Sequence, residues 1–92
     1  MSEGAHYFFP PATAYRLNRC LYLLKSDPMF RARYLAESVA ALTELGLGDE
    51  DQAAVRAAER DTLVARGAHP YLVFMADLRL RMARGTATFE YF

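Results

Sequence analysis

The fold is decided by residues 61–74, DTLVARGAHPYLVF. This stretch predicts the end of a short helix, a hinge at Gly67-Ala68-His69, and a longer apolar helix that begins at Pro70. Glycine adopts the left-handed conformation that often ends a helix, and proline is favoured at the first helical position, where an N–H has no helical partner. We therefore expect a tight corner between two helices, with His69 at its tip.

The helix after the corner is expected to run from Pro70 to about residue 84 and to end at Gly85. It is apolar on nearly all sides: one stripe consists of Tyr71, Phe74, Met75, Leu78 and Met82, and a second of Leu72, Ala76, Leu80 and Ala83. A helix with two apolar sides is either the centre of its own bundle or half of an interface.

Four helices are expected before the corner, over residues 11–26, 28–45, 50–59 and 61–66. The first carries an apolar stripe of Ala14, Leu17, Cys20, Leu21 and Leu24. The other three have predicted N-caps at Asp27, Asp49 and Asp61, because a carboxylate can accept hydrogen bonds from the first free N–H groups of a helix. Pro28 reinforces the first of these starts.

The predicted fold class is therefore all-α, a small bundle of about five helices with extended N- and C-terminal arms. The 92 residues, 53% of them hydrophobic, suit a single domain over 1–92. That domain divides into an arm (1–10), a helical core (11–85) and a tail (86–92). Both arms are rich in aromatic residues, which either fold back on the domain or contact another chain.

Charge and hydropathy disfavour several functional classes. Eleven basic residues balance eleven acidic ones without a basic stripe, which disfavours nucleic-acid binding. No apolar run approaches the roughly 20 residues that span a bilayer, so no membrane contact is expected. The N-terminal residues lack the pattern of a secretory signal, and the single cysteine cannot form an internal disulfide. We therefore expect a cytoplasmic protein.

The chain offers little chemistry of its own. Its two histidines, His6 and His69, lie far apart, and no HxxxH, HxxE or CxxC spacing predicts a metal site. Cys20 falls on an apolar stripe, which favours a buried structural thiol over a nucleophile. We assign no catalytic residue and no metal ligand. His69 either caps the last helix or contacts a ligand.

Some apolar surface remains for a partner. Tyr15 and Tyr22 flank Arg19 on the side of the first helix opposite its apolar stripe, where they either pack along the flank or bind another chain. With Leu72 and Leu80 on the last helix, these three residues form our predicted partner interface.

From Phe30 onwards the sequence is FRARYLAESVAALTELGLGDEDQAAVRAAERDTLVARGAHPYLVFMADL. This run resembles the small (α) subunit of protocatechuate 4,5-dioxygenase, in the LigA-like family of extradiol ring-cleavage dioxygenases. The resemblance covers about residues 25–80 and rests on Pro28 and Phe30, residues 46–55, Arg60-Asp61, Leu63-Val64, Gly67 and residues 71–74. The family often has Gly-Asn at the corner, where this chain has Ala68-His69.

The resemblance implies an accessory helical subunit that covers the active site of a separate, larger subunit. The large subunit of that family holds non-haem Fe(II) and opens aromatic diols with O₂, whereas the small subunit closes the pocket without binding iron. On this reading the chain contains no cofactor and meets the diol through its partner. The residues implied to cap the substrate are Gly67, His69, Tyr71 and Phe74.

Two alternative functions are also consistent with the sequence. The module also resembles the helical recognition domain of borosin-type peptide precursors, which a methyltransferase holds while it modifies the tail. Alternatively, the apolar surface serves homodimerisation or binding without any role in ring cleavage.

Overall fold

The computed structural model describes residues 12–85. This range forms six helices and no strand: α2 (Ala12–Ser26), α3 (Pro28–Ala36), α4 (Ser38–Glu44), α5 (Asp49–Ala57), α6 (Arg60–Ala65) and α7 (Pro70–Ala83). The predicted all-α class is confirmed. The predicted arms, residues 1–10 and 86–92, lie outside the described residues. No helix within residues 12–85 is long and apolar enough to cross a membrane.

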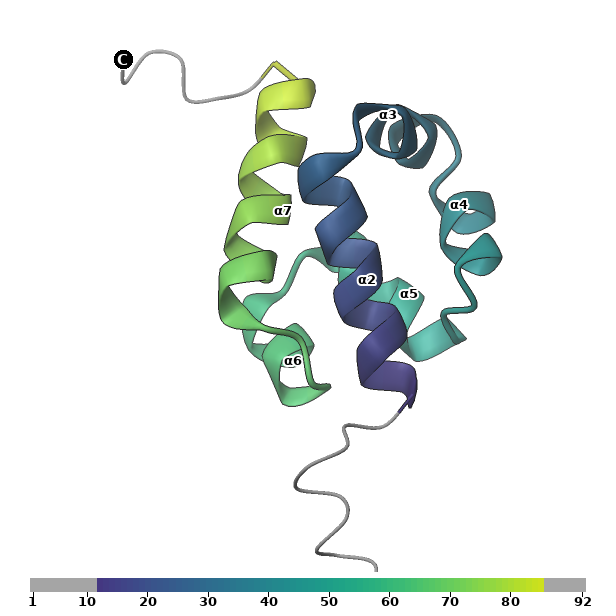
Figure 1. Cartoon of the computed structure of the whole chain (residues 1–92), viewed down its shortest axis with the longest axis vertical. Helices are drawn as coiled ribbons and strands as arrows, with labels where there is room; N and C mark the ends of the chain where they lie inside the picture. Colours follow the sequence, from purple (N-terminus) through teal and green to yellow (C-terminus); the bar gives the residue numbers. More distant parts are fainter. Residues whose placement is uncertain (1–11, 86–92) are drawn as a thin grey trace, which may run out of the picture.

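Helices α2 and α7 lie side by side, run in the same direction, and make the most extensive helix–helix contact in the fold (Figure 1). Because two parallel helices need a long connection, α3 to α6 carry the chain from the end of α2 back to the level of its start. In Figure 1, α3 and α4 lie on the α2 side of the pair, and α6 lies next to the start of α7. The corner before α7 therefore lies beside the first half of α2.

The core lies between α2, α7 and the connecting helices. α2 contributes Leu17, Cys20, Leu21 and Leu24, which are at most 2% exposed. The buried face of α7 consists of Val73, Ala76 and Leu80, and neither of the two stripes predicted for this helix is buried as a whole. Leu78, in the first stripe, is only half-buried. The sequence periodicity did not predict the buried face of α7, because a helix that is apolar on all sides shows little difference in hydropathy between its faces.

The helix predicted over residues 28–45 is in fact two helices, separated at Glu37 (φ −145°, ψ 74°). The break lets Arg33 on α3 reach Glu44 on α4, with 2.6 Å between Nη2 and Oε2. In an uninterrupted helix these residues would be about 16 Å apart along the axis. The bend also brings Tyr34 and Leu42 into the same core. The break is therefore associated with contacts between the two helices, and no glycine or proline marks it.

Of the three predicted N-caps, only Asp27 is observed. Asp27 caps α3 as expected, because its Oδ1 accepts from the N–H groups of Met29 (3.0 Å) and Phe30 (3.2 Å). The predictions for Asp49 and Asp61 were wrong: the N-cap residues are Gly48 and Glu59, and neither helix has a side-chain cap bond.

Buried polar contacts explain part of this difference. Gln52, expected to take part in a capping box, is buried and donates to Leu47 O (3.0 Å) and Thr43 Oγ1 (3.1 Å). Asp51, also buried, pairs with Arg66 at the end of α6. The side chains near the start of α5 therefore tie it to its neighbours instead of capping it.

Candidate functional site

The corner between α6 and α7 has the predicted geometry. Gly67 has φ +104°, in the region that residues with a Cβ rarely adopt, and α7 begins at Pro70. His69 is the N-cap of α7: its Nδ1 accepts from the N–H of Tyr71 at 3.1 Å. The interpretation of His69 as a helix cap is therefore confirmed. Its imidazole remains exposed beyond the cap.

Asn18, on α2, fixes the corner in place. Its Nδ2 donates to the carbonyl of Gly67 (3.0 Å), and its Oδ1 accepts from the backbone N–H of His69 (2.7 Å). The same amide donates to Ala14 O (3.0 Å), within α2 itself. Three hydrogen bonds therefore orient Asn18, and two of them connect α2 to backbone groups on either side of Ala68.

The corner is also packed closely against α2. A Cβ added to Gly67 would lie 2.8 Å from Ala14 Cβ, closer than side-chain carbons approach in real structures. Ala68 is itself buried, at 4% exposed. Asn18 and this close approach hold the backbone rigidly while His69, Pro70 and Tyr71 face solvent.

Large aromatic side chains are exposed on both members of the α2–α7 pair. We call four of them the exposed aromatic group, with these exposed fractions: Tyr15 67%, Tyr22 52%, Tyr71 54% and Phe74 60%. Tyr22 also lies under the Lys25 ammonium, 5.4 Å from the ring centre. This group includes two residues predicted for the partner interface and two predicted to cap a substrate.

The remaining predicted interface residues differ in accessibility. Arg19 is exposed on α2. Leu72 is half-buried and packs against the core. Leu80 must be removed from the predicted surface: it is only 5% exposed and packs in the core, because it follows Val73 by seven residues on the buried face of α7. The structure therefore leaves Leu80 no free surface to offer a partner.

The described residues offer little covalent or metal chemistry. Cys20 is fully buried, and burial raises the pKa of its thiol from 9.0 to about 12, so the reactive thiolate is strongly disfavoured. Within residues 12–85 no three His, Cys, Asp or Glu side chains lie together as a metal site. His6 lies outside the described residues.

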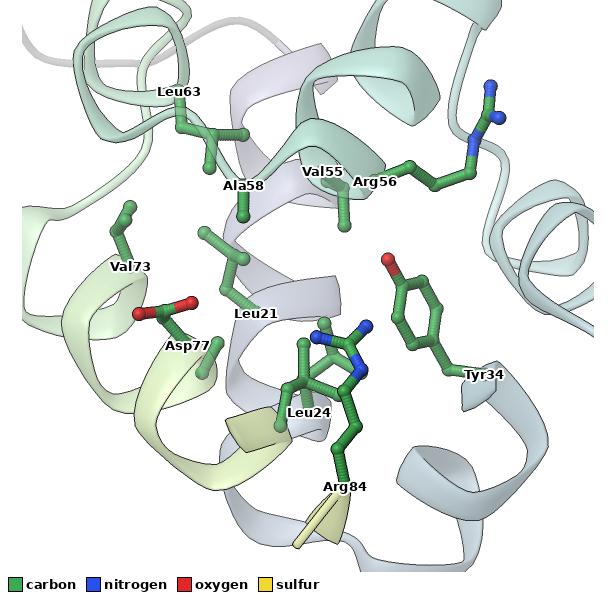
Figure 2. A pocket seen from close by; sticks show the side chains of 12 residues that line it. Leu21, Leu24, Tyr34, Val55, Arg56, Ala58, Leu63, Val73, Asp77 and Arg84 are labelled. Carbon is green, nitrogen blue, oxygen red and sulfur yellow. The ribbon is translucent and has the colours of Figure 1, made fainter. Parts of the chain in front are cut away.

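The pocket at the core of the described residues is small. A cavity of about 40 Å³ lies between α2, α5 and α7, lined by apolar side chains together with Tyr34, Arg56, Asp77 and Arg84 (Figure 2). An engineered cavity of roughly 150 Å³ holds benzene, so this pocket of about 40 Å³ is too small for an aromatic ring. An open hollow of about 230 Å³ shares Tyr34, Arg56 and Arg84 with it. Contact with an aromatic ring would therefore involve the outer surface.

Two features of the site were missed from the sequence. Asn18 lies at the edge of the apolar stripe of α2, four residues after Ala14 and three before Leu21. An amide in that position was the sequence feature that could have indicated a polar contact with the corner. No sequence pattern predicted that Tyr34, Arg56 and Arg84 line one hollow, because these residues belong to three segments that only folding brings together.

Comparison with known proteins adds one match. The family model described as the LigA subunit of the aromatic-ring-opening dioxygenase LigAB matches residues 17–89, which includes the corner and the whole of α3 to α7. No match was found among curated proteins or among solved structures. The match covers most of the chain and agrees with the resemblance carried by residues 25–80. The chain therefore belongs to the LigA-subunit family of aromatic-ring-opening dioxygenases.

Proposed function

We propose that this chain is the accessory small subunit of an aromatic-ring-opening dioxygenase and docks on a separate, catalytic large subunit. Membership of the LigA-subunit family supports both the reaction class and the existence of a partner subunit. The observation that carries the docking proposal is the exposed aromatic group, because four aromatic rings more than half exposed on two adjoining helices are typical of an interface.

The energetics favour covering this group. An aromatic side chain buries about 150–250 Å² when fully covered, and burial contributes about 25 cal/mol per Å². Covering the exposed part of each ring, 52–67% of the residue, therefore stabilises a complex by about 2–4 kcal/mol before the costs of association. Four such rings supply enough free energy for a specific complex.

We further propose that the corner lies at the mouth of the large subunit's active site, where it helps to exclude water from an aromatic diol and O₂. His69 supports this role. Because its Nδ1 accepts from the N–H of Tyr71, the neutral ring carries its proton on Nε2. That N–H is a donor available to a substrate oxygen, held in position by the cap and by Asn18.

The Fe(II) of the reaction belongs, in this proposal, to the large subunit. The described residues of this chain do not fit an iron site, since they bring no three suitable ligands together. We therefore assign this chain no step in the redox chemistry. Its contribution is to close the pocket, exclude water and contact the substrate.

The docking proposal is tested by purifying the tagged full chain from its native host and identifying the protein that co-purifies. The purified pair is then assayed for O₂ uptake with protocatechuate. The double variant Tyr71→Ser/Phe74→Ser should weaken association at least 100-fold. Met29→Ser is the matched control, because Met29 is an apolar residue 82% exposed on α3, outside the exposed aromatic group.

Two results would overturn docking on a large subunit. One is a partner without O₂-dependent ring opening. The other is a chain that sediments as a homodimer which Tyr71→Ser/Phe74→Ser dissociates, because the exposed aromatic group would then serve self-association.

The capping role has its own test in the reconstituted pair. His69→Ala and His69→Asn both remove the imidazole N–H, but asparagine keeps the ability to cap α7. If Nε2 contacts the substrate, both variants should raise KM while subunit association stays nearly unchanged. A rise only in His69→Ala would assign His69 to helix capping alone, and unchanged kinetics in both would remove it from the site.

A further inference from the structure

Tyr34 is a buried residue with an unsatisfied polar atom. Its side chain comes from α3 into the core, and the residue is only 3% exposed. Its hydroxyl makes no hydrogen bond to any residue in the described part of the chain. Figure 2 shows this hydroxyl directed into the space between the side chain of Arg56 and the guanidinium of Arg84. Buried hydroxyls nearly always have a partner, either protein or water, so this one is available to a group that enters the adjoining hollow.

Two arginines line the hollow beside Tyr34. Within residues 12–85, neither Arg56 nor Arg84 lies within ion-pair distance of a carboxylate, whereas Arg33 and Arg66 each have a carboxylate partner. The positive charges of both arginines act on Tyr34: burial raises the pKa of its hydroxyl, and Arg84 and Arg56 lower it. Within residues 12–85, two arginines without a carboxylate partner therefore line the same hollow as the Tyr34 hydroxyl, although the Arg56 guanidinium is directed away from that hydroxyl (Figure 2).

The hollow at this point has a lining suited to an anion. It measures about 230 Å³, opens to solvent, and is lined by Tyr34, Leu35, Ser38, Arg56 and Arg84. Among residues 12–85, no carboxylate lines it. Asp77 lines the adjoining inner cavity and pairs with Arg81 on the same helix, with 3.0 Å between Oδ2 and Nε.

We propose that Tyr34, Arg56 and Arg84 form a binding site for the carboxylate or phosphate group of a small molecule. Guanidinium groups bind such oxyanions through paired N–H donors, and the Tyr34 hydroxyl supplies a further donor from the buried side. Ser38 adds a hydroxyl at the rim, and Leu35 an apolar wall for the rest of the ligand. This site is separate from the exposed aromatic group and does not depend on the proposed function.

The test is a titration of the ¹⁵N-labelled full chain, followed by NMR, with sodium benzoate in one arm and inorganic phosphate in the other, at constant ionic strength. The two arms distinguish a carboxylate from a phosphate ligand. Saturable shifts are expected for the Nε–H signals of Arg56 and Arg84. Arg56→Gln and Arg84→Gln should each weaken binding about tenfold or more, because each removes charged donors to the anion.

Two variants keep the test independent of folding. Tyr34→Phe retains the buried ring and should weaken binding several-fold without loss of the native spectrum. Arg60→Gln, at an exposed arginine on α6 that lines neither the hollow nor the cavity, should bind as the unmodified chain does. Saturable binding of neither probe, or binding that Arg56→Gln and Arg84→Gln leave unchanged, would overturn the proposal.

Discussion

Substituting Gly67 by alanine should destabilise the fold through two separable effects. The first is conformational: φ is +104° at this position, and left-handed backbone costs a residue with a Cβ about 1–2 kcal/mol. The second is steric, because the new Cβ would lie 2.8 Å from Ala14 Cβ, and overpacking of this kind costs about 1–3 kcal/mol. Together they predict a loss of about 2–5 kcal/mol in the free energy of unfolding.

The two effects are separated by repeating the substitution in an Ala14→Gly background. With Ala14 Cβ removed, the nearest atom to the new Cβ is Ala14 Cα at 3.6 Å, an ordinary van der Waals contact. Only the conformational effect should then remain, about 1–2 kcal/mol. The four chains are compared by urea unfolding followed by circular dichroism at 222 nm, which gives a coupling energy of about 1–3 kcal/mol.

Gly85 provides the control. Its φ is +78°, and a Cβ there would meet nothing within 4 Å, so Gly85→Ala should show a conformational effect without a steric one. A coupling energy between positions 14 and 67 below about 0.5 kcal/mol would refute the close approach of the corner to α2. Equal losses for Gly67→Ala and Gly85→Ala would refute it as well.

Three further predictions test the core and the corner. Leu80→Ala should lower the free energy of unfolding by about 2–5 kcal/mol, and Leu78→Ala by clearly less, because Leu80 is buried and Leu78 half-buried; equal losses in urea unfolding would contradict this assignment of faces. Cys20 should resist iodoacetamide at pH 8 until the chain is unfolded, and the free energy of unfolding should fall as the pH rises from 9.0 towards about 12, because the folded state favours the neutral thiol. Cys20→Ala should reduce that fall. An unchanged pH profile in Cys20→Ala would be evidence against the burial of the Cys20 thiol. Asn18→Ala should lower stability by about 1–3 kcal/mol and speed amide exchange at His69, since two bonds between α2 and the corner are lost; unchanged exchange would show that Asn18 does not hold the corner.

The features that were predictable from the sequence are those whose cause is local. Gly67 and Pro70 restrict the backbone by their own geometry, so the corner and the start of α7 were correctly predicted. The same holds for Asp27 and Pro28 at the start of α3. The apolar stripe of α2 was also correct, because its polar and apolar faces are distinct.

The features that were missed depend on contacts between distant residues. No glycine or proline marks the break at Glu37, which is associated with the pairing of Arg33 and Glu44 across two helices. At the candidate site, the exposure of Tyr71 and Phe74 required knowing which side of α7 faces α2. The bonds from Asn18 to Gly67 and His69 join positions about 50 residues apart, and no local pattern encodes them.

The parallel pairing of α2 and α7 has a consequence for how the protein is made. During synthesis α2 leaves the ribosome before α7, the helix with which it makes its most extensive contact and whose buried face ends at Leu80. Until that residue has left the exit tunnel, the nascent chain keeps apolar side chains of α2 uncovered. The fold therefore cannot be completed before α7 has been synthesised, and until then the apolar side chains of α2 are accessible to chaperones.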